Sequence, residues 1–260
     1  KTGHMPALHI TPHAPAAMAV CVLHGSGCDK TYYAWRMADA FVSRGIAVLL
    51  VDLDGHGESP RIQQFPDMLD NAVQGVEWLH ERYAQVGLVG VSLGGCLAAR
   101  AVADGLAVEA LALLEAPPYL HFTPQHVRRE ALALGAPFLL DLFGESTPFH
   151  LGATIYDLVR VQRLPRIRCT IGTVELIATL DLAGSLARIT APVMLVYGER
   201  DAIVRPDQAA LVRGAAPPHA LFVTIPEASH LSLILHPGAL ERLGSWMAGR
   251  LSARQAAGAG

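Results

Sequence analysis

Short apolar runs and amphipathic stretches alternate along most of this chain. Runs rich in valine and leucine are typical of strands buried on both faces of a sheet, whereas apolar residues three and four positions apart indicate helices with one buried face. This alternation predicts an α/β fold, a mostly parallel sheet with helices on both faces. The expected strands are residues 17–23, 46–53, 86–91, 108–114, 192–197 and 220–225, and the expected helices are residues 31–43, 72–83, 93–104 and a last helix from about residue 237.

The alternation lapses between about residue 120 and residue 189, where prolines interrupt amphipathic stretches. We therefore expect an α/β core formed by residues 6–119 and 190–254, with residues 120–189 as a helical insertion. Ligands of open α/β sheets bind at the carboxyl ends of the strands. An insertion over that edge is a candidate lid.

Composition and charge exclude several classes of partner. With 260 residues, of which 52% are hydrophobic, the chain can fill the core of one large domain. Its formal net charge of −3 leaves no basic excess, so we expect no nucleic-acid partner. No apolar run reaches the roughly 18 residues of a membrane-spanning helix, and residues 14–23 lack the basic flank of a signal peptide. We expect a cytoplasmic protein without a membrane span, in which residues 1–5 are a tag remnant that ends at the natural start, Met5.

The four cysteines carry no pattern of metal or disulfide chemistry. They are spread through apolar segments without C-x-x-C spacing, at Cys21, Cys28, Cys96 and Cys169. This spacing favours reduced thiols over zinc ligands or a disulfide framework.

A glycine-flanked serine is the strongest chemical signal. Ser92 stands between an apolar strand and an alanine-rich helix, with Gly90 and Gly94 two positions away on either side. The same pentapeptide also occurs by chance as an ordinary turn, but the strand before it and the helix after it favour a nucleophile elbow. In that sharp turn a side chain at either glycine would collide with the backbone. The serine hydroxyl then stands at a helix N-terminus, which favours a developing oxyanion.

A serine hydroxyl is a poor nucleophile at neutral pH and needs a base within hydrogen-bond reach, oriented by a third group. Such groups are expected at the carboxyl ends of neighbouring strands. Asp201 follows the strand predicted at residues 192–197, and His230 follows the strand predicted at residues 220–225. The order along the chain is Ser92, Asp201, His230.

Each of these assignments has a rival. Glu115 also follows a strand and is an alternative acid, although Asp201 is favoured. Asp207 lies further into its loop, which fits a surface residue or a helix cap better. His236 stands at the start of a predicted helix and lacks the strand-end position of His230.

Four segments in this order resemble the motifs of the α/β-hydrolase superfamily, in particular its serine esterases and lysophospholipase-like (serine aminopeptidase-like) enzymes. The segments are His24-Gly25-Ser26-Gly27, Asp54-Gly55-His56-Gly57-Glu58-Ser59, Gly90-x-Ser92-x-Gly94, and Gly198-Glu199-Arg200-Asp201 with the later Ser229-His230. The resemblance spans nearly the whole chain outside the insertion and implies the α/β-hydrolase fold with a helical lid. Because few residues precede the first core strand, we expect the usual leading hairpin to be shortened to about residues 7–11, and a sheet of seven strands.

The resemblance assigns the role of nucleophile to Ser92, general base to His230 and orienting acid to Asp201. It also implies an oxyanion hole made by the backbone N–H groups of Ser26 and Leu93. The implied reaction is hydrolysis of a carboxylic ester through an acyl-enzyme, on a small-molecule acyl ester or thioester and without a cofactor or metal.

Several other functions stay open. Thioesterases, lactonases, carbon–carbon bond hydrolases and peptidases use the same triad. Haloalkane dehalogenases and epoxide hydrolases of the family carry aspartate in place of Ser92, which argues against both. A non-catalytic small-molecule receptor is the alternative from another class, because fold does not dictate function.

The insertion carries two further features. Four arginines, Arg160, Arg163, Arg166 and Arg168, form either a solvated face or an anchor for an acidic substrate. An apolar cluster would pack the lid or line an acyl pocket; its members are Leu132, Leu134, Phe138, Leu139, Leu140, Leu142 and Phe143.

Overall fold

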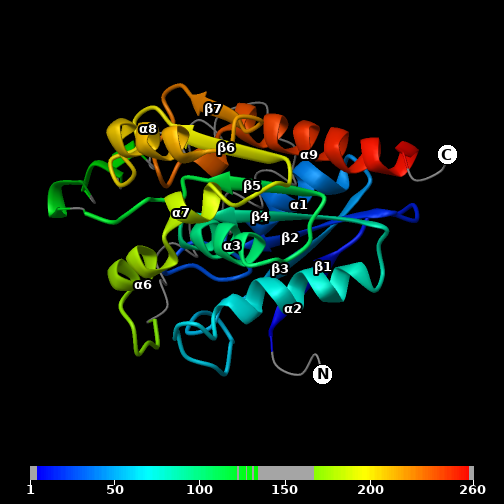
Figure 1. The fold of residues 1–260 in the computed structure, drawn as a ribbon, viewed down its shortest axis with the longest axis horizontal. Coiled ribbons are helices and arrows are strands. Elements are labelled where there is room, and N and C mark those ends of the chain that lie inside the picture. Colours follow the sequence, from blue (N-terminus) through cyan, green and yellow to red (C-terminus); the bar gives the residue numbers. More distant parts are fainter. Residues whose placement is uncertain (1–4, 122, 127, 131, 134–166, 258–260) are drawn as a thin grey trace.

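The computed structural model describes residues 5–121, 123–126, 128–130, 132–133 and 167–257. Within these residues seven strands form one sheet in the order β1-β3-β2-β4-β5-β6-β7, with β1 and β7 at its edges (Figure 1). β1 pairs antiparallel with β3, and the other neighbouring strands are parallel. The strands are β1 (Ala7–Ile10), β2 (Met18–Leu23), β3 (Ile46–Val51), β4 (Gln85–Val91), β5 (Ala110–Leu114), β6 (Val193–Gly198) and β7 (Leu221–Ile225). The expected mostly parallel sheet of seven strands, with a short leading strand, is confirmed.

Helices cover both faces of the sheet. One core cluster contains buried side chains of α2 (Leu69–His80), α3 (Leu93–Ala103), α6 (Thr173–Leu180), α7 (Leu182–Leu186) and α8 (Pro206–Ala215). The cluster on the opposite face contains those of α1 (Ala34–Val42), the 3₁₀ helix η1 (Leu233–Leu235) and α9 (Pro237–Ala257).

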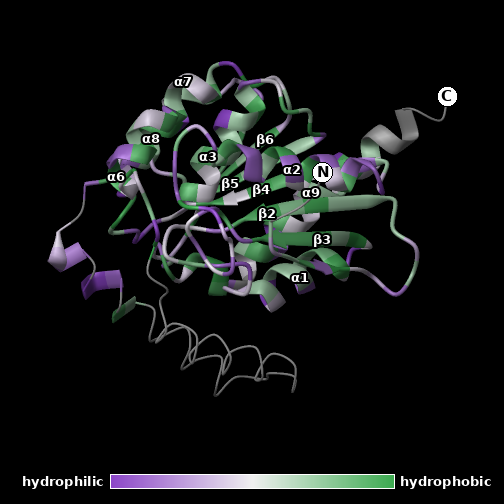
Figure 2. Cartoon of the chain, turned by 90° about the horizontal axis from the view of Figure 1, so that it is seen from below, coloured by the Kyte–Doolittle hydropathy of each residue, from purple (hydrophilic) through white to green (hydrophobic). Residues whose placement is uncertain are grey.

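Alternation along β2 explains why this strand reads as a continuous apolar run. Cys21 and Leu23 belong to the first cluster, whereas Val20 and Val22 belong to the second. Successive side chains of a strand point to opposite faces, so a strand covered on both faces is apolar at every position. The central strands are accordingly hydrophobic along their length (Figure 2).

Several elements differ from the expectation. α2 spans residues 69–80 instead of residues 72–83. α1 begins at Ala34 instead of residue 31, because Tyr33 adopts a left-handed backbone with φ of 54° and ends a turn. α8 was not predicted from the apolar pattern. It begins with Pro206, and the Gln208 side chain accepts a hydrogen bond from the Arg205 N–H at 3.1 Å. A proline and a capping side chain in the first turn are typical of helix starts.

The insertion and its role as a lid stay predictions, since residues 134–166 lie outside the described residues. This segment holds Arg160, Arg163 and Arg166 and all of the predicted apolar cluster except Leu132, which is 69% exposed. At the other end of the insertion, Leu176, Leu180 and Leu182 of α6 and α7 are buried in the cluster that contains α3.

Arg168 is paired with the loop after β3. Its guanidinium donates to the Ser59 carbonyl, and its backbone N–H donates to Gly55 O at 3.0 Å. The Gln63 N–H in turn donates to Arg168 O at 2.8 Å. Arg168 thus makes hydrogen bonds to the loop after β3 of the same chain. Its role in anchoring an acidic substrate stays a prediction.

In the part of the chain that the structure describes, no helix has the length and apolar character needed to cross a membrane. The cytoplasmic location stays a prediction.

Candidate active site

Ser92 occupies a strained turn between β4 and α3. Its φ of 51° and ψ of −114° lie outside the regions that ordinary residues prefer, and its N–H donates to Leu114 O at 2.8 Å. A Cβ at Gly90 would lie 2.4 Å from Gly94 O, and a Cβ at Gly94 would lie 2.4 Å from Leu23 O. The glycines are therefore required by close backbone approach, as the elbow motif predicted.

His230 lies between Ser92 and Asp201. Its Nδ1 is 2.8 Å from Asp201 Oδ2, and its Nε2 is 3.2 Å from Ser92 Oγ. A carboxylate only accepts hydrogen bonds, so Nδ1 donates to Asp201. In the neutral imidazole Nε2 then accepts from the serine hydroxyl. The three residues follow the carboxyl ends of β4, β6 and β7, the strand-end positions from which the sequence analysis chose them.

The loop after β6 holds the Asp201 carboxylate in place. Asp201 is almost wholly buried, and its Oδ1 accepts from the N–H groups of Ile203 at 2.7 Å and Val204 at 2.6 Å. The loop after β7 is tied to it, because the Arg200 N–H donates to Ala228 O at 2.8 Å. With Oδ1 held in this way, Oδ2 is directed at His230.

Two opposing effects set the pKa of His230. Burial lowers the pKa of this imidazole, but the charge of Asp201, its hydrogen bond and the more distant charge of Glu130 raise it, and the net result is a pKa above 6.5. The carboxylates stabilise the imidazolium form that a general base must reach during proton transfer.

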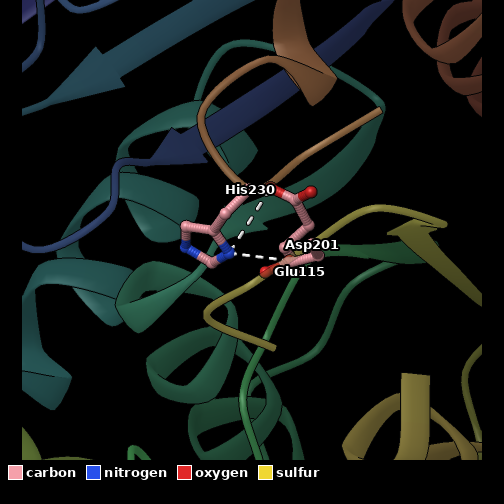
Figure 3. A group of neighbouring side chains, drawn as sticks. All are labelled: Glu115, Asp201 and His230. Atoms are coloured by element: carbon pink, nitrogen blue, oxygen red, sulfur yellow. Dashed lines mark hydrogen bonds and ion pairs between the residues drawn. The ribbon is translucent and has the colours of Figure 1, made fainter. Parts of the chain in front are cut away.

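Glu115 is a second carboxyl group beside the same histidine (Figure 3). It is fully buried directly after β5, has a φ of 52°, and its Oε2 lies 3.8 Å from His230 Nδ1. Burial, first, and then the charges of Asp201 and Glu130 raise the pKa of Glu115 well above its usual range. Burial therefore favours the protonated form of Glu115 more than in an ordinary glutamate, and Asp201 is the carboxylate within hydrogen-bond distance of His230.

Glu115, Asp201 and His230 also form the group of potential metal ligands found among the described residues, with one ligand atom from each lying within 4.8 Å of the others. A cation here would compete for His230 Nδ1 and Asp201 Oδ2, which already bind each other. The geometry fits the orientation of an imidazole better than the binding of a metal.

The loop after β2 approaches the serine from the other side. A Cβ at Gly25 would lie 3.3 Å from Ser92 Cβ, and the Ser26 hydroxyl lies 2.9 Å from the hydroxyl of Thr173 in α6. Leu93 is the first residue of α3, where a backbone N–H has no partner inside the helix. Ser26 and Leu93 thus lie next to Ser92, and their role as oxyanion-hole donors stays a prediction.

His24 braces this loop. Its Nδ1 donates to Gly25 O at 2.8 Å, and its Nε2 accepts from the Leu53 N–H at 3.1 Å. Burial and the neighbouring His56 lower the pKa of His24 to about 3. Both ring nitrogens are used in the neutral form, so His24 is a structural residue.

Comparison with known proteins places these features in a family. The family model described as "Alpha/beta hydrolase family" matches residues 20–243, which include the elbow, Asp201 and His230. The chain belongs to the alpha/beta hydrolase family.

Curated relatives of this alpha/beta hydrolase include two methyl ester esterases. A pimeloyl-[acyl-carrier protein] methyl ester esterase of Pectobacterium atrosepticum is 26% identical over 90% of this chain and 96% of that protein. The protein of the same name from Yersinia enterocolitica is 24% identical, over 85% of this chain and 90% of that protein.

Solved structures share the fold of this alpha/beta hydrolase. An esterase from Thermogutta terrifontis has a TM-score of 0.62 at 19% identity, covering 95% of this chain and 94% of that chain. The alpha/beta hydrolase GrgF from a Penicillium species has a TM-score of 0.70 at 18% identity, covering 95% and 99%. At these identities the likeness shows the fold.

A cavity of about 80 Å³ opens beside Ser92 and His230 in this alpha/beta hydrolase. Most of its wall is apolar, with contributions from β2, α1 and η1, and Lys30 reaches it from the loop after β2. Asp29 lines it as well. The apolar lining residues include Val22, Tyr33, Met37, Leu50, Val51, Val91, Leu231 and Ile234.

The alternative acid and base considered from the sequence, Asp207 and His236, have other positions in the structure. Asp207 is exposed in the first turn of α8 and pairs with Arg205 at 3.1 Å. His236 precedes α9. Glu130 was not expected at the site; it is buried and hydrogen-bonded to the loops that carry Asp201 and His230. Its sequence context, directly after two arginines, is that of a surface glutamate and carries no signal for this position.

Proposed function

We propose that this alpha/beta hydrolase is a carboxylic ester hydrolase that works through an acyl-enzyme on Ser92, with His230 as general base and Asp201 as orienting acid. The observation that carries the proposal is the chain of two hydrogen-bond distances, 3.2 Å from Ser92 Oγ to His230 Nε2 and 2.8 Å from His230 Nδ1 to Asp201 Oδ2. A nucleophile, a base and an orienting group in contact are what activation of a serine hydroxyl requires.

The reaction runs in two halves. Ser92 Oγ attacks the ester carbonyl while its proton moves to His230 Nε2, and the resulting oxyanion accepts hydrogen bonds from the N–H groups of Ser26 and Leu93. The C–O bond to the alcohol then breaks as His230 returns the proton to the leaving alkoxide. In the second half His230 takes a proton from water, the hydroxide attacks the acyl-enzyme, and the acid leaves as Ser92 regains its proton.

The substrate we propose is an ester with an apolar group next to the scissile carbonyl. The apolar wall of the cavity beside Ser92, with Tyr33, Met37 and Ile234, favours such a group over a charged one. Oxygen esters are favoured over thioesters, lactones and carbon–carbon bonds because the two curated relatives named above are methyl ester esterases.

The test combines labelling with turnover. A fluorophosphonate probe should label the wild-type chain, and Ser92→Ala should abolish both labelling and hydrolysis of p-nitrophenyl acetate. Ser252→Ala, which removes an exposed serine hydroxyl on α9, is the matched control and should keep both. Hydrolysis of p-nitrophenyl acetate by Ser92→Ala at the wild-type rate would contradict the proposal. A single turnover by the wild-type chain, with the product still bound, would favour a receptor.

A further inference from the structure

Glu130 is a buried carboxyl group on a helical segment where most of the other described residues are exposed. Its side chain is almost wholly buried, whereas Arg128 and Arg129 are exposed and Leu132 is 69% exposed. Burying a carboxylate is costly unless hydrogen bonds compensate it. A segment that exposes leucine and buries glutamate therefore needs a specific partner for the carboxylate.

The partners are two backbone N–H groups next to the proposed catalytic residues. Glu130 Oε1 accepts from the Ala202 N–H at 2.7 Å, and Glu130 Oε2 accepts from the Leu231 N–H at 3.1 Å. Ala202 directly follows Asp201, and Leu231 directly follows His230. One carboxylate thus bridges the loop after β6 and the loop after β7, with a charge-assisted hydrogen bond to each.

This bridge bears on the geometry of the site because His230 contacts Asp201 across the gap between the same two loops. The backbone bond from Arg200 N–H to Ala228 O joins the loops before these residues, and Glu130 joins them after. Together the two ties fix the separation at which the imidazole spans Asp201 and Ser92.

We propose that Glu130 is a positioning residue, which holds the loops of Asp201 and His230 together and links the predicted insertion to the catalytic residues. This inference rests on the proposed function of Ser92, His230 and Asp201. Glu130 does not touch the reacting atoms, so it acts through His230.

The charge of Glu130 allows its positioning role to be tested through the pKa of His230. Three carboxyl groups act on His230. Asp201 is hydrogen-bonded to it, Glu115 lies 3.8 Å from its Nδ1, and Glu130 binds the backbone of the loops after β6 and β7. The Glu130 carboxylate contributes to the raised pKa of His230. Removing the charge should lower that pKa, whereas a general loss of stability would leave it unchanged.

The experiment compares Glu130→Gln and Glu130→Asp in the full chain, with p-nitrophenyl acetate as substrate. Misplacing a catalytic group by about 1 Å costs on the order of 10²-fold, so we expect Glu130→Gln to lower kcat about 10- to 100-fold with little change in KM. Its acidic limb in kcat/KM should move to lower pH. Glu130→Asp keeps the charge but shortens the reach, so kcat should fall while the acidic limb stays near that of the wild type.

Controls separate this inference from the function on which it rests. Glu175→Gln makes the same change at an exposed position of α6 and should leave kcat and the pH profile unchanged. If Ser92→Ala is inactive while Glu130→Gln keeps the wild-type kcat and acidic limb, the positioning role is wrong and the proposed function stands. If Glu130→Gln does not fold, Glu130→Asp decides: an unchanged kcat overturns the role, and a reduced kcat with an unmoved acidic limb supports it.

Discussion

The Oε2 atom of Glu115 lies 3.8 Å from His230 Nδ1, and the same nitrogen is hydrogen-bonded to Asp201 Oδ2 at 2.8 Å. Two carboxyl groups so close to each other in a buried site do not both ionise readily. Burial and the charge of Asp201 raise the pKa of Glu115, so Glu115 holds a proton more readily than an ordinary glutamate does.

We predict that Glu115 substitutes in part for a lost Asp201. Replacing the triad aspartate by asparagine in a serine hydrolase can cost about 10⁴-fold in kcat. With Asp201→Asn, the remaining carboxyl loses its charged neighbour, ionises more readily and can orient His230, so we expect a loss nearer about 10²-fold.

The double variant tests this substitution. Glu115→Gln alone should change kcat/KM by only a few-fold, because Asp201 is the group hydrogen-bonded to His230. The double variant, Asp201→Asn with Glu115→Gln, should fall well below Asp201→Asn alone. Equal activity of the single Asp201 variant and the double variant would show that Glu115 provides no substitute.

The pH dependence of the reaction follows from His230. A general base must be neutral before it accepts a proton, and the pKa of His230 is raised above 6.5. We therefore expect the acidic limb of kcat/KM, measured from pH 5 to 9, to have its midpoint above 6.5. Asp201→Asn combined with Glu115→Gln removes both neighbouring carboxyl groups and should move that midpoint to lower pH. A wild-type midpoint at or below 6.5 would contradict the assignment of His230 as the base.

Gly94→Ala should disable the elbow. The added Cβ would lie 2.4 Å from Leu23 O and 2.6 Å from His24 O, which are backbone atoms that cannot rotate away. The turn must shift, so we expect kcat to fall by about 10²-fold or more with a lower melting temperature. Gly214→Ala is the control: it lies in α8 with open space around a Cβ, and should raise stability by about 0.5–1 kcal/mol without affecting kcat.

Ser26→Ala should retain most activity. In the proposed oxyanion hole the donor is the backbone N–H, and the hydroxyl instead contacts Thr173 at 2.9 Å. We expect kcat/KM within about fivefold of wild type, because a neutral, partly exposed hydrogen bond contributes only about 1 kcal/mol. A loss of about 10²-fold or more would assign the hydroxyl itself a role in binding the oxyanion.

His24 should make the fold sensitive to acid. Its pKa of about 3 in the folded chain is depressed below the usual 6.5, so the unfolded chain binds a proton between these values that the folded chain does not. The free energy of unfolding is therefore highest above pH 6.5 and falls as pH decreases, by up to about 1.4 kcal/mol per pH unit for this one group.

Urea unfolding at pH 7 and pH 5 measures this contribution. His24→Gln lowers stability at pH 7, because Gln replaces the two ring hydrogen bonds imperfectly, but its stability should fall less between the two pH values than that of the wild type. His13→Gln, at an exposed position, should behave as the wild type. An equal fall for His24→Gln and wild type would contradict the neutral, buried state of His24.

Local sequence carried most of the fold, because strands buried on both faces must be apolar at nearly every position. The turn at Ser92 could also be predicted locally, because the backbone approaches Gly90 and Gly94 so closely that a side chain would not fit there. The start of α1 was missed because the left-handed Tyr33 leaves no mark on apolar spacing. Glu130 was missed because nothing local distinguishes a buried glutamate after two arginines from a solvated one; its partners lie 72 and 101 positions away.

The predicted insertion is hydrogen-bonded to the core at both of its described ends. On the N-terminal side Glu130 binds the loops of Asp201 and His230, and on the C-terminal side Arg168 and Cys169 run beside Gly55 and Gln63. Residues 134–166 lie between these two junctions. A chimera that exchanges only those residues with the corresponding segment of a relative would keep both junctions intact. If the predicted insertion forms part of the substrate site, we expect such a chimera to change substrate preference and to keep ester hydrolysis.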